Sequence, residues 1–439
     1  MGKVGISLFL FFFGTSSIFS KGIGRAAKVV DKDKLPLDLV NIIDIALQRN
    51  NNIKISYLGV DMGESDVKIS KSAFFPTITA RGGYAYSKNL DTKDSANNRE
   101  LSLGASYTVF VFGRDKKRAE QMEYALNQLN YGNNETIQNI IYDISASYYK
   151  ILRLLAEKNS LVESEKLSSE TLKAASLKHK LGIAVLADKL SAKAGNSRDR
   201  LRLIQVDRDI KNSKSELNLL LNLESNYDLF IEEPEIKIKK SKIGFSELLE
   251  IALKKRNDLR KKLEEKKIKE KEIEIVRLEK LPTVELSAGI SENDSYGQDN
   301  TNSNISVGVS VPLFSGFRNT NQIRKAKSDL KKTDIEIEEM KNMIAQEVWT
   351  AHNNLATSEQ SFSIAKETLE SESAHAKLML GMYKNGKSSI LQVLDANDKL
   401  QNARFELIAT KYDWLNYRIA LLKVIGRMTI ENINNPEEF

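Results

Sequence analysis

Four stretches of the chain alternate apolar residues with small or polar ones at every second position. They lie at about residues 76–88, 100–112, 282–291 and 304–314. In the first of them, Ile78 and Ala80 alternate with Thr77 and Thr79. A period of two predicts β-strands with one apolar face, and strands of about ten residues are long enough to cross a bilayer. The same pattern also fits two hairpins that pack on the core of a soluble domain.

Long stretches of helical character follow each pair of strands. Between residues 115 and 180 the sequence contains no proline, and a single glycine interrupts it. One helix over that stretch would be about 100 Å long. A shorter helix follows, so residues 115–223 are predicted to form a helical hairpin with its turn near Gly182. Residues 318–426 predict a second hairpin, with its turn near Gly386.

The second turn contains signals that end one helix and start the next. Gly386 suits the left-handed residue that ends a helix. Ser389 and Gln392, three positions apart, form the capping-box pattern that starts a helix. The helix that follows has seam positions in alternating steps of three and four, which is typical of a coiled coil. These positions are Leu391, Leu394, Asp398, Gln401, Phe405, Ile408, Tyr412, Leu415, Ile419 and Leu422.

The chain contains an internal repeat. The similar stretches "IDIALQRNN" and "LEIALKKRN" begin at Ile43 and Leu249, and the strands and turns follow in the same order after each. We therefore divide the chain into a first repeat at residues 36–240 and a second at residues 241–439. In each repeat the returning helix of the hairpin is shorter than the outgoing one. The helix before each strand pair, near residues 52–73 in the first repeat, has about the missing length, so we expect the two to stack end to end.

The N-terminus has the pattern of a secretory signal peptide. One lysine precedes the apolar stretch "VGISLFLFFFG", and small residues suitable for cleavage follow up to Ser20. We expect residues 1–20 to be removed and the mature chain to be exported. No later stretch reaches about 18 consecutive apolar residues, so a membrane-inserted form is expected to use its strands in a closed barrel. Because the smallest barrels have about eight strands, several chains would share one.

Composition excludes several kinds of chemistry. The chain has no cysteine and only three histidines, none of them at metal-ligand spacing from a partner. We therefore expect no metal and no cofactor. The net charge of +7 comes from 66 basic and 59 acidic residues that are interspersed, so nucleic-acid binding is not expected. No nucleophile–base pair or phosphate-binding loop is recognisable, and we expect no enzymatic activity.

Several motifs resemble those of the TolC family of outer-membrane efflux proteins. They are "YKNG" at Tyr383, "SIL" at Ser389, "VLDA" at Val393 and "VPLFSGFRN" at Val311. The resemblance covers essentially the whole mature sequence. It implies a mainly α-helical fold with a β-barrel part: long coiled-coil hairpins forming a periplasmic tunnel, and four strands per chain contributing to a twelve-stranded barrel shared by a homotrimer. The barrel would lie in outer-membrane lipid.

The resemblance also implies partners and a function. A periplasmic adaptor protein and an inner-membrane transporter would dock below the tunnel, in an efflux pump or a type I secretion system. The channel would be a passive exit for drugs, small molecules or proteins. Another interpretation of the residues is a barrel-anchored trimeric coiled-coil adhesin or structural stalk. The duplicated strand pair and hairpin favour the channel, because a stalk does not need a second copy of either.

The resemblance assigns adaptor docking to the two tips. Gly182 and Ile183 match the contact positions of the first tip, and Gly386 and Lys387 match those of the second.

It also assigns gating and constriction to three residues near the tips. Asp188 and Tyr383 match gating positions that hold neighbouring hairpins together, and Asp395 matches an acidic constriction. Two positions depart from the family pattern. Gln392 replaces a frequent acidic residue, and Ser388 replaces a basic gating partner. The charge network of the gate is therefore expected to differ here.

Overall fold

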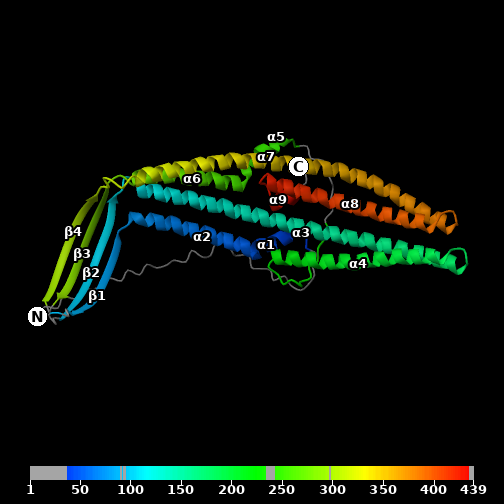
Figure 1. Cartoon of the computed structure of the whole chain (residues 1–439), viewed down its shortest axis with the longest axis horizontal. Coiled ribbons are helices and arrows are strands. Elements are labelled where there is room, and N and C mark those ends of the chain that lie inside the picture. The colour runs from blue at the N-terminus through cyan, green and yellow to red at the C-terminus, as the bar shows by residue number, and fades with distance from the viewer. Residues whose placement is uncertain (1–36, 89–90, 92–94, 234–242, 296–297, 435–439) are drawn as a thin grey trace.

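The protein is an elongated molecule with a β-sheet at one end and two helical turns at the other (Figure 1). The computed structural model describes residues 37–88, 91, 95–233, 243–295 and 298–434. The predicted signal peptide lies outside the described residues. Among the described helices, none is both long and apolar enough to span a bilayer.

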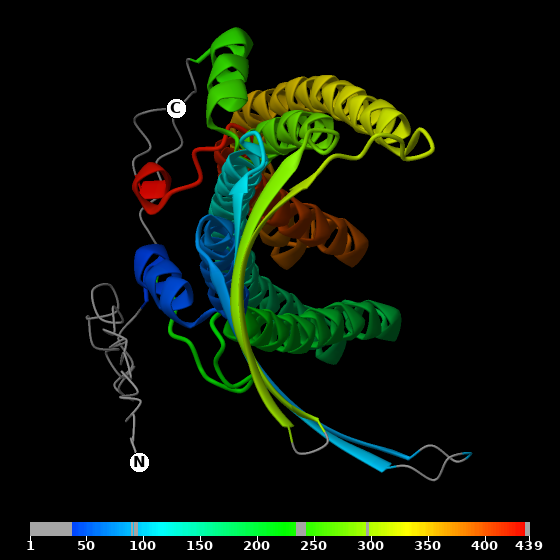
Figure 2. The same cartoon turned by 90° about the vertical axis from the view of Figure 1, so that its left-hand side faces the viewer.

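Four antiparallel strands form one curved sheet in the order β1-β2-β3-β4 (Figure 2). They are β1 (Thr77–Lys88), β2 (Ser95–Phe110), β3 (Thr283–Ser295) and β4 (Gln298–Ser310). The register aligns the predicted apolar positions across all four strands, for example Ile78 with Ala105, Ala288 and Ile305. The predicted alternation is therefore confirmed as one apolar face. In the described part of the chain, the outer edges of β1 and β4 have no strand partner.

The strands extend further than the alternating pattern indicates. The sequence places the start of the second strand near residue 100 and that of the fourth near residue 304. In the structure, β2 begins at Ser95 and β4 at Gln298, and β3 continues to Ser295. At their other ends β2 and β4 stop at Phe110 and Ser310, short of the predicted limits at residues 112 and 314. Apart from Ala96, the extra residues are polar. Ladder hydrogen bonds join backbone groups, so pairing continues where the apolar face has already ended.

Two helical hairpins make up most of the length. The helices are α1 (Leu39–Arg49), α2 (Asn51–Lys71), α3 (Arg114–Lys180), α4 (Leu186–Leu220), α5 (Phe245–Lys255), α6 (Asn257–Leu278), α7 (Arg318–Lys384), α8 (Ile390–Val424) and α9 (Ile430–Asn434), with a 3₁₀ turn at Ser72–Phe74. The outgoing helices α3 and α7 have 67 residues each, against 35 in the returning helices α4 and α8. At 1.5 Å per residue, the outgoing helices are about 100 Å long.

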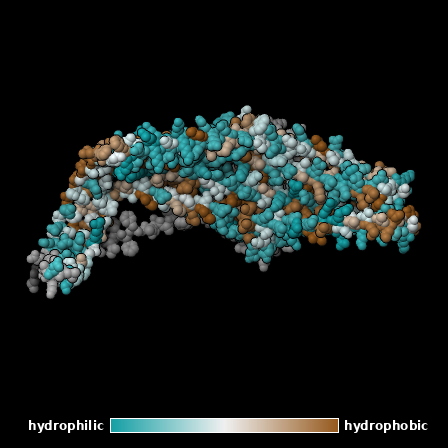
Figure 3. Space-filling model, viewed as in Figure 1, coloured by the Kyte–Doolittle hydropathy of each residue, from teal (hydrophilic) through white to brown (hydrophobic). Residues whose placement is uncertain are grey.

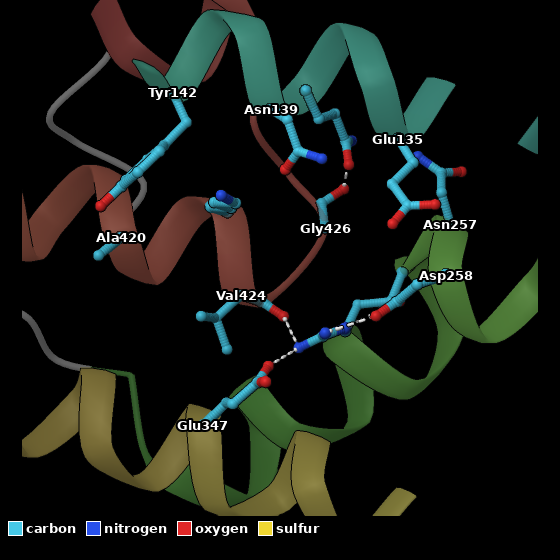
Figure 4. A pocket seen from close by; sticks show the side chains of 12 residues that line it. Glu135, Asn139, Tyr142, Asn257, Asp258, Glu347, Ala420, Val424 and Gly426 are labelled. Carbon is cyan, nitrogen blue, oxygen red and sulfur yellow. Dashed lines mark hydrogen bonds and ion pairs between the residues drawn. The ribbon is translucent and has the colours of Figure 1, made fainter. Parts of the chain in front are cut away.

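The short helices stack on the returning ones as predicted. The Asn50 side chain accepts hydrogen bonds from the first amides of α2 and donates one to the Leu220 carbonyl at the end of α4, at 2.8 Å. In the second repeat, Arg256 precedes α6 and donates to the Val424 carbonyl at the end of α8, at 3.3 Å. Arg256 also binds Asp258 and Glu347 (Figure 4). One side chain thus closes each joint between two stacked helices.

The main core surrounds these joints. Apolar residues of α1, α3, α5 and α8 meet there, and the largest fully buried side chains include Tyr148, Tyr412, Ile42 and Ile43. Between this core and the hairpin tips, the helices pack together through three smaller clusters of buried apolar residues.

The predicted seam of α8 is correct far from the tip and wrong near it. Tyr412 is buried, and so are Leu415, Ile419 and Leu422. Near the tip, Leu391 is 67% exposed and the buried positions are instead Ile390, Val393, Ala396 and Leu400. The reason is that α8 contacts α3 as well as its hairpin partner α7, so a single seam does not describe its buried face.

Candidate functional site

Each hairpin tip is closed by a glycine in the left-handed region. Gly182 has φ 72° and Gly386 has φ 75°. In the first tip, the amides of Gly182 and Ile183 donate to the carbonyls of His179 and Lys178, at 3.0 and 2.8 Å. The second tip repeats this arrangement between residues 382 and 387. These paired bonds define a Schellman motif, which ends a helix most readily with glycine at the left-handed position.

The two tips present different surfaces. The first exposes Leu181, Ile183, Val185 and Leu186, and apolar residues gather at this end of the molecule (Figure 3). The second tip, at residues 384–387, exposes two lysines, an asparagine and a glycine. One tip therefore offers an apolar surface and the other a basic one.

The returning helices also start differently. In α8, Ser389 and Gln392 form the predicted capping box: the Ser389 amide donates to Gln392 Oε1 at 2.9 Å, and the Gln392 amide donates to Ser389 Oγ at 3.3 Å. Gln392, one of the two departures from the family pattern, thus has a structural role. In α4, Val185 provides no side-chain cap, and Asp188 lies in the first turn, where a negative charge interacts favourably with the helix dipole.

Tyr383 connects the two hairpins of the chain. Its side chain is 3% exposed. Lys178, in the last turns of α3, donates to the Tyr383 carbonyl, and its ammonium lies 4.3 Å from the centre of the Tyr383 ring. Burial, with a smaller contribution from the charge of Asp188, raises the pKa of the Tyr383 phenol. Lys178 thus contacts Tyr383 directly, and Asp188 lies near enough for its charge to act on the phenol.

Sequence reasoning did not identify Lys178. It lies four residues before Gly182, in a run of charged residues typical of a solvated helix end. Its contact with Tyr383 arises because the two hairpins lie side by side, and no local sequence pattern predicts that arrangement. Ser388, where the resemblance leads us to expect a basic residue, donates to the Met379 carbonyl at 3.2 Å. The basic group beside Tyr383 thus comes from the other hairpin.

Asp395 is separate from this cluster. It is exposed, and its carboxylate forms an ion pair with Lys399 one turn later, at 2.9 Å. This contact raises the pKa of Lys399. Within one chain, the charge of Asp395 is thus accompanied by a basic group on the same helix.

Comparison with known proteins identifies the family. The family model for outer membrane efflux proteins matches residues 42–223 and 248–427, one segment in each repeat. The chain belongs to this family. It is 24% identical to the outer membrane efflux protein BepC of Brucella suis, over 90% of the chain and 87% of that relative. It is 19% identical to the outer membrane protein TolC of Escherichia coli, over 90% of the chain and 83% of that relative.

Solved structures agree with the fold of this efflux protein. The Campylobacter jejuni CmeC outer membrane channel superposes with a TM-score of 0.78 at 17% identity, over 89% of the chain and 85% of that channel. The Neisseria gonorrhoeae MtrE outer membrane channel, in its open state, superposes with a TM-score of 0.71 at 18% identity, covering 88% of each. The efflux protein is thus a channel of the Gram-negative outer membrane and not an enzyme. The adhesin or stalk interpretation is set aside.

The efflux protein has a polar layer between its hairpins, above the tips. Arg202 of α4 donates to Gln401 of α8 at 2.5 Å, and Asp199 lies beside Arg202 at 3.6 Å. Asp199 is 8% exposed, and burial raises its pKa, with a smaller contribution from the charge of Asp398. The predicted polar part of the seam is thus a network of side chains that joins α4 to α8.

Proposed function

We propose that three copies of the chain form one channel with a shared twelve-stranded barrel. The observation that carries this proposal is the pair of open edges on β1 and β4. A sheet with unpaired edges is not viable in lipid, and four strands are too few to close a barrel. Pairing β4 of one copy with β1 of the next removes every open edge, and three copies supply twelve strands.

We propose that the tips bind a periplasmic adaptor protein, which connects the channel to an inner-membrane transporter. Gly182 and Ile183 belong to the turn between α3 and α4, and Gly386 and Lys387 to the turn between α7 and α8. Both turns lie at the end of the molecule furthest from the sheet (Figure 1). The exposed apolar side chains of the first tip suit an apolar groove, and the lysines of the second suit acidic residues. Such a surface gives an adaptor two distinct contacts on each chain.

We propose that Tyr383, Asp188 and Lys178 hold the tips together in the closed channel. The ammonium of Lys178 lies against the buried Tyr383 ring, so the contact joins the α3–α4 hairpin to the α7–α8 hairpin. Lys178 takes the place of the basic group that is absent at position 388. Asp395, with its partner Lys399, is proposed to face the lumen as part of a constriction.

The assembly is tested by mass and conductance. The purified protein in detergent is expected to have the mass of three chains, and the same preparation is expected to conduct ions in a planar bilayer. A preparation of single chains with full conductance would rule out the shared barrel. Trimers without any conductance would contradict the channel.

A further inference from the structure

The junction between the sheet and the long helices carries exposed apolar side chains. Leu313, Phe314 and Phe317 lie between β4 and α7, with exposed fractions of 93, 77 and 69%. Phe110 and Phe112 lie at the corresponding junction between β2 and α3, at 51 and 41%. Apolar residues accordingly gather where the sheet meets the helices (Figure 3). They extend the apolar surface of the sheet as far as the first helical residues.

Basic residues lie beside these apolar ones. The segments that join the sheet to the helices are "KISKSAFFP" from Lys68, "VFGRDKKR" from Val111, "RLEKLP" from Arg277 and "VPLFSGFRNTNQIR" from Val311. Together they contain ten basic residues and two acidic ones, whereas the whole chain has 66 and 59. Six of these bases, which we call the basic collar, are exposed and form no ion pair in the described part of the chain: Lys68, Lys116, Arg277, Lys280, Arg318 and Arg324.

The two long helices begin with a base where the helix dipole disfavours one. Arg114 and Arg318 are the first residues of α3 and α7. The residues before them, Gly113 and Phe317, provide no side-chain cap, and the first turn of α7 contains no acidic residue. A cation at a helix N-terminus is unfavourable, because the dipole is positive there. Contacts within the chain thus do not account for Arg318, whereas an anion from outside would offset both the side chain and the dipole.

We propose that the basic collar binds the headgroups of anionic phospholipids in the periplasmic leaflet of the outer membrane. The inference rests on the proposed shared barrel, which puts the sheet in lipid and the helices in the periplasm. In that arrangement the apolar residues of the junction meet the lipid interface, and the basic collar begins at the level of the headgroups.

The length of the basic collar fits this placement. Arg324, the collar residue furthest along α7, comes six residues after Arg318, which is about 9 Å along the helix. At 0.1 M salt an exposed charge acts over about 10 Å. The whole of the basic collar on α7 therefore lies within reach of charged headgroups at the junction.

The opposite end of the sheet has a different charge. On β3 the apolar face, which includes Ile290, continues to Glu292 and Asp294 near the hairpin. One base, Arg99 on β2, lies opposite Asp294, and Asp299 on β4 lies opposite it on the other side. An acidic surface repels anionic headgroups, so the charge complementarity is confined to the end of the sheet that meets the helices.

Lipid retention tests the basic collar. The purified trimer in a non-ionic detergent is stripped of lipid, incubated with equal amounts of phosphatidylglycerol and phosphatidylcholine with the same acyl chains, and separated from free lipid by size exclusion. Mass spectrometry of the retained lipid gives the ratio of the two. Both lipids contain a phosphate, but only phosphatidylglycerol has a net negative charge, so we expect it to be retained in at least fivefold excess. Added salt at about 0.5 M is expected to reduce this excess, because it screens exposed charges.

Variants of three collar residues locate the site. Lys116→Gln, Arg277→Gln and Arg324→Gln together remove one charge from each of α3, α6 and α7, and the excess is expected to fall below twofold. The charge-keeping variant Lys116→Arg with Arg277→Lys and Arg324→Lys is expected to retain the full excess. All three side chains are exposed and form no ion pair in the part of the chain that the structure describes, so both variants are expected to fold.

A matched control removes the same number of charges elsewhere. Lys341→Gln, Lys366→Gln and Lys377→Gln change three exposed lysines of α7 that lie further from the sheet. This variant has the same net charge as the first, and it is expected to retain phosphatidylglycerol in at least fivefold excess.

The outcomes separate this inference from the proposed trimer. Trimers that show no excess of phosphatidylglycerol, or the same excess after the three collar charges are removed, overturn the basic collar and leave the trimer standing. An excess abolished by millimolar inorganic phosphate, but not by sodium chloride at the same ionic strength, indicates a site for free phosphate and also overturns it. Single chains in place of trimers would overturn the shared barrel and, with it, the place of the basic collar in the membrane.

Discussion

Three glycines allow the tip geometry to be tested with one chemical change, the addition of a methyl group. Gly386 closes the second tip at φ 75°, and an added Cβ would meet nothing within 4 Å. Gly381 lies five residues earlier, inside α7, with equally open space. Gly426 ends α8 at φ 70°, where an added Cβ would lie 2.8 Å from the Lys255 backbone carbon. The three sites thus separate backbone strain from steric overlap.

The structure predicts that the same substitution changes the stability by a different amount, or in a different direction, at each site. Gly386→Ala places a side chain in the left-handed region, which costs about 1–2 kcal/mol. The lower entropy of the unfolded chain offsets about 0.4–1 kcal/mol of this, so we expect a net loss of about 1 kcal/mol. Gly381→Ala is expected to stabilise by about 0.5–1 kcal/mol, since it replaces glycine inside a helix. Gly426→Ala adds overlap with backbone atoms, about 1–3 kcal/mol more than Gly386→Ala.

The measurement is the denaturant midpoint of each purified protein, followed by circular dichroism, together with export from cells producing it. We expect Gly386→Ala to assemble normally but lose export, because the new side chain re-aims the docking surface. Gly381→Ala, the matched control in the same tip, is expected to keep export. Equal stability changes at Gly386 and Gly381 would refute the left-handed turn. Normal export from Gly386→Ala would remove this turn from the docking surface.

Three further predictions concern charged groups near the tips. Lys178→Met removes the cation beside Tyr383 while keeping an apolar stem, and we expect a larger closed-state leak conductance in bilayers; unchanged conductance would exclude Lys178 from the gate. Burial raises the pKa of Asp199, so its contribution to stability is greatest at low pH and is lost as pH rises from about 4 through the raised pKa. Asp199→Asn should therefore stabilise the protein at neutral pH and flatten its acid dependence, as measured by unfolding midpoints across pH. Asp395→Asn is expected to lower cation selectivity while trimers persist, and Lys399→Gln to raise it; reversal potentials that stay the same in both variants would place Asp395 outside the constriction.

The hairpins and strands could be predicted because their signals are local. A proline-free stretch, a left-handed glycine and a capping box each act within a few residues, and the structure places Gly386 and Ser389 as expected. The ends of the strands are harder to predict from the sequence, because the alternating pattern marks the apolar face of the sheet and not the extent of the backbone hydrogen bonds. The mostly polar residues from Ser95 to about residue 100 pair along the ladder beyond the alternating apolar pattern.

The proposed gate cluster can be predicted only in part from the sequence. The family pattern points to Tyr383 and Asp188, but Lys178 lies on the other long helix from Tyr383 and aligns with no charged residue in the second repeat. Likewise, the exposure of Leu391 reflects the contact of α8 with both α7 and α3. These contacts join segments about two hundred residues apart. They depend on how the two hairpins pack against each other, which no local sequence pattern indicates.

The joints between stacked helices show what the repeat preserves and what it changes. Arg256 closes the second joint and binds Glu347 on the long helix beside it. In the first repeat the mates of these two residues are Asn50 and Asp143. Asn50 still reaches the carbonyl at the end of the stacked helix, but it has no charge to offer a carboxylate. Burial accordingly raises the pKa of Asp143, and the charge of Lys423 counters this only in part. Both joints therefore keep the hydrogen bond from one stacked helix to the last carbonyls of the other. Only the second joint, which has Arg256, also has an ion pair with the neighbouring long helix.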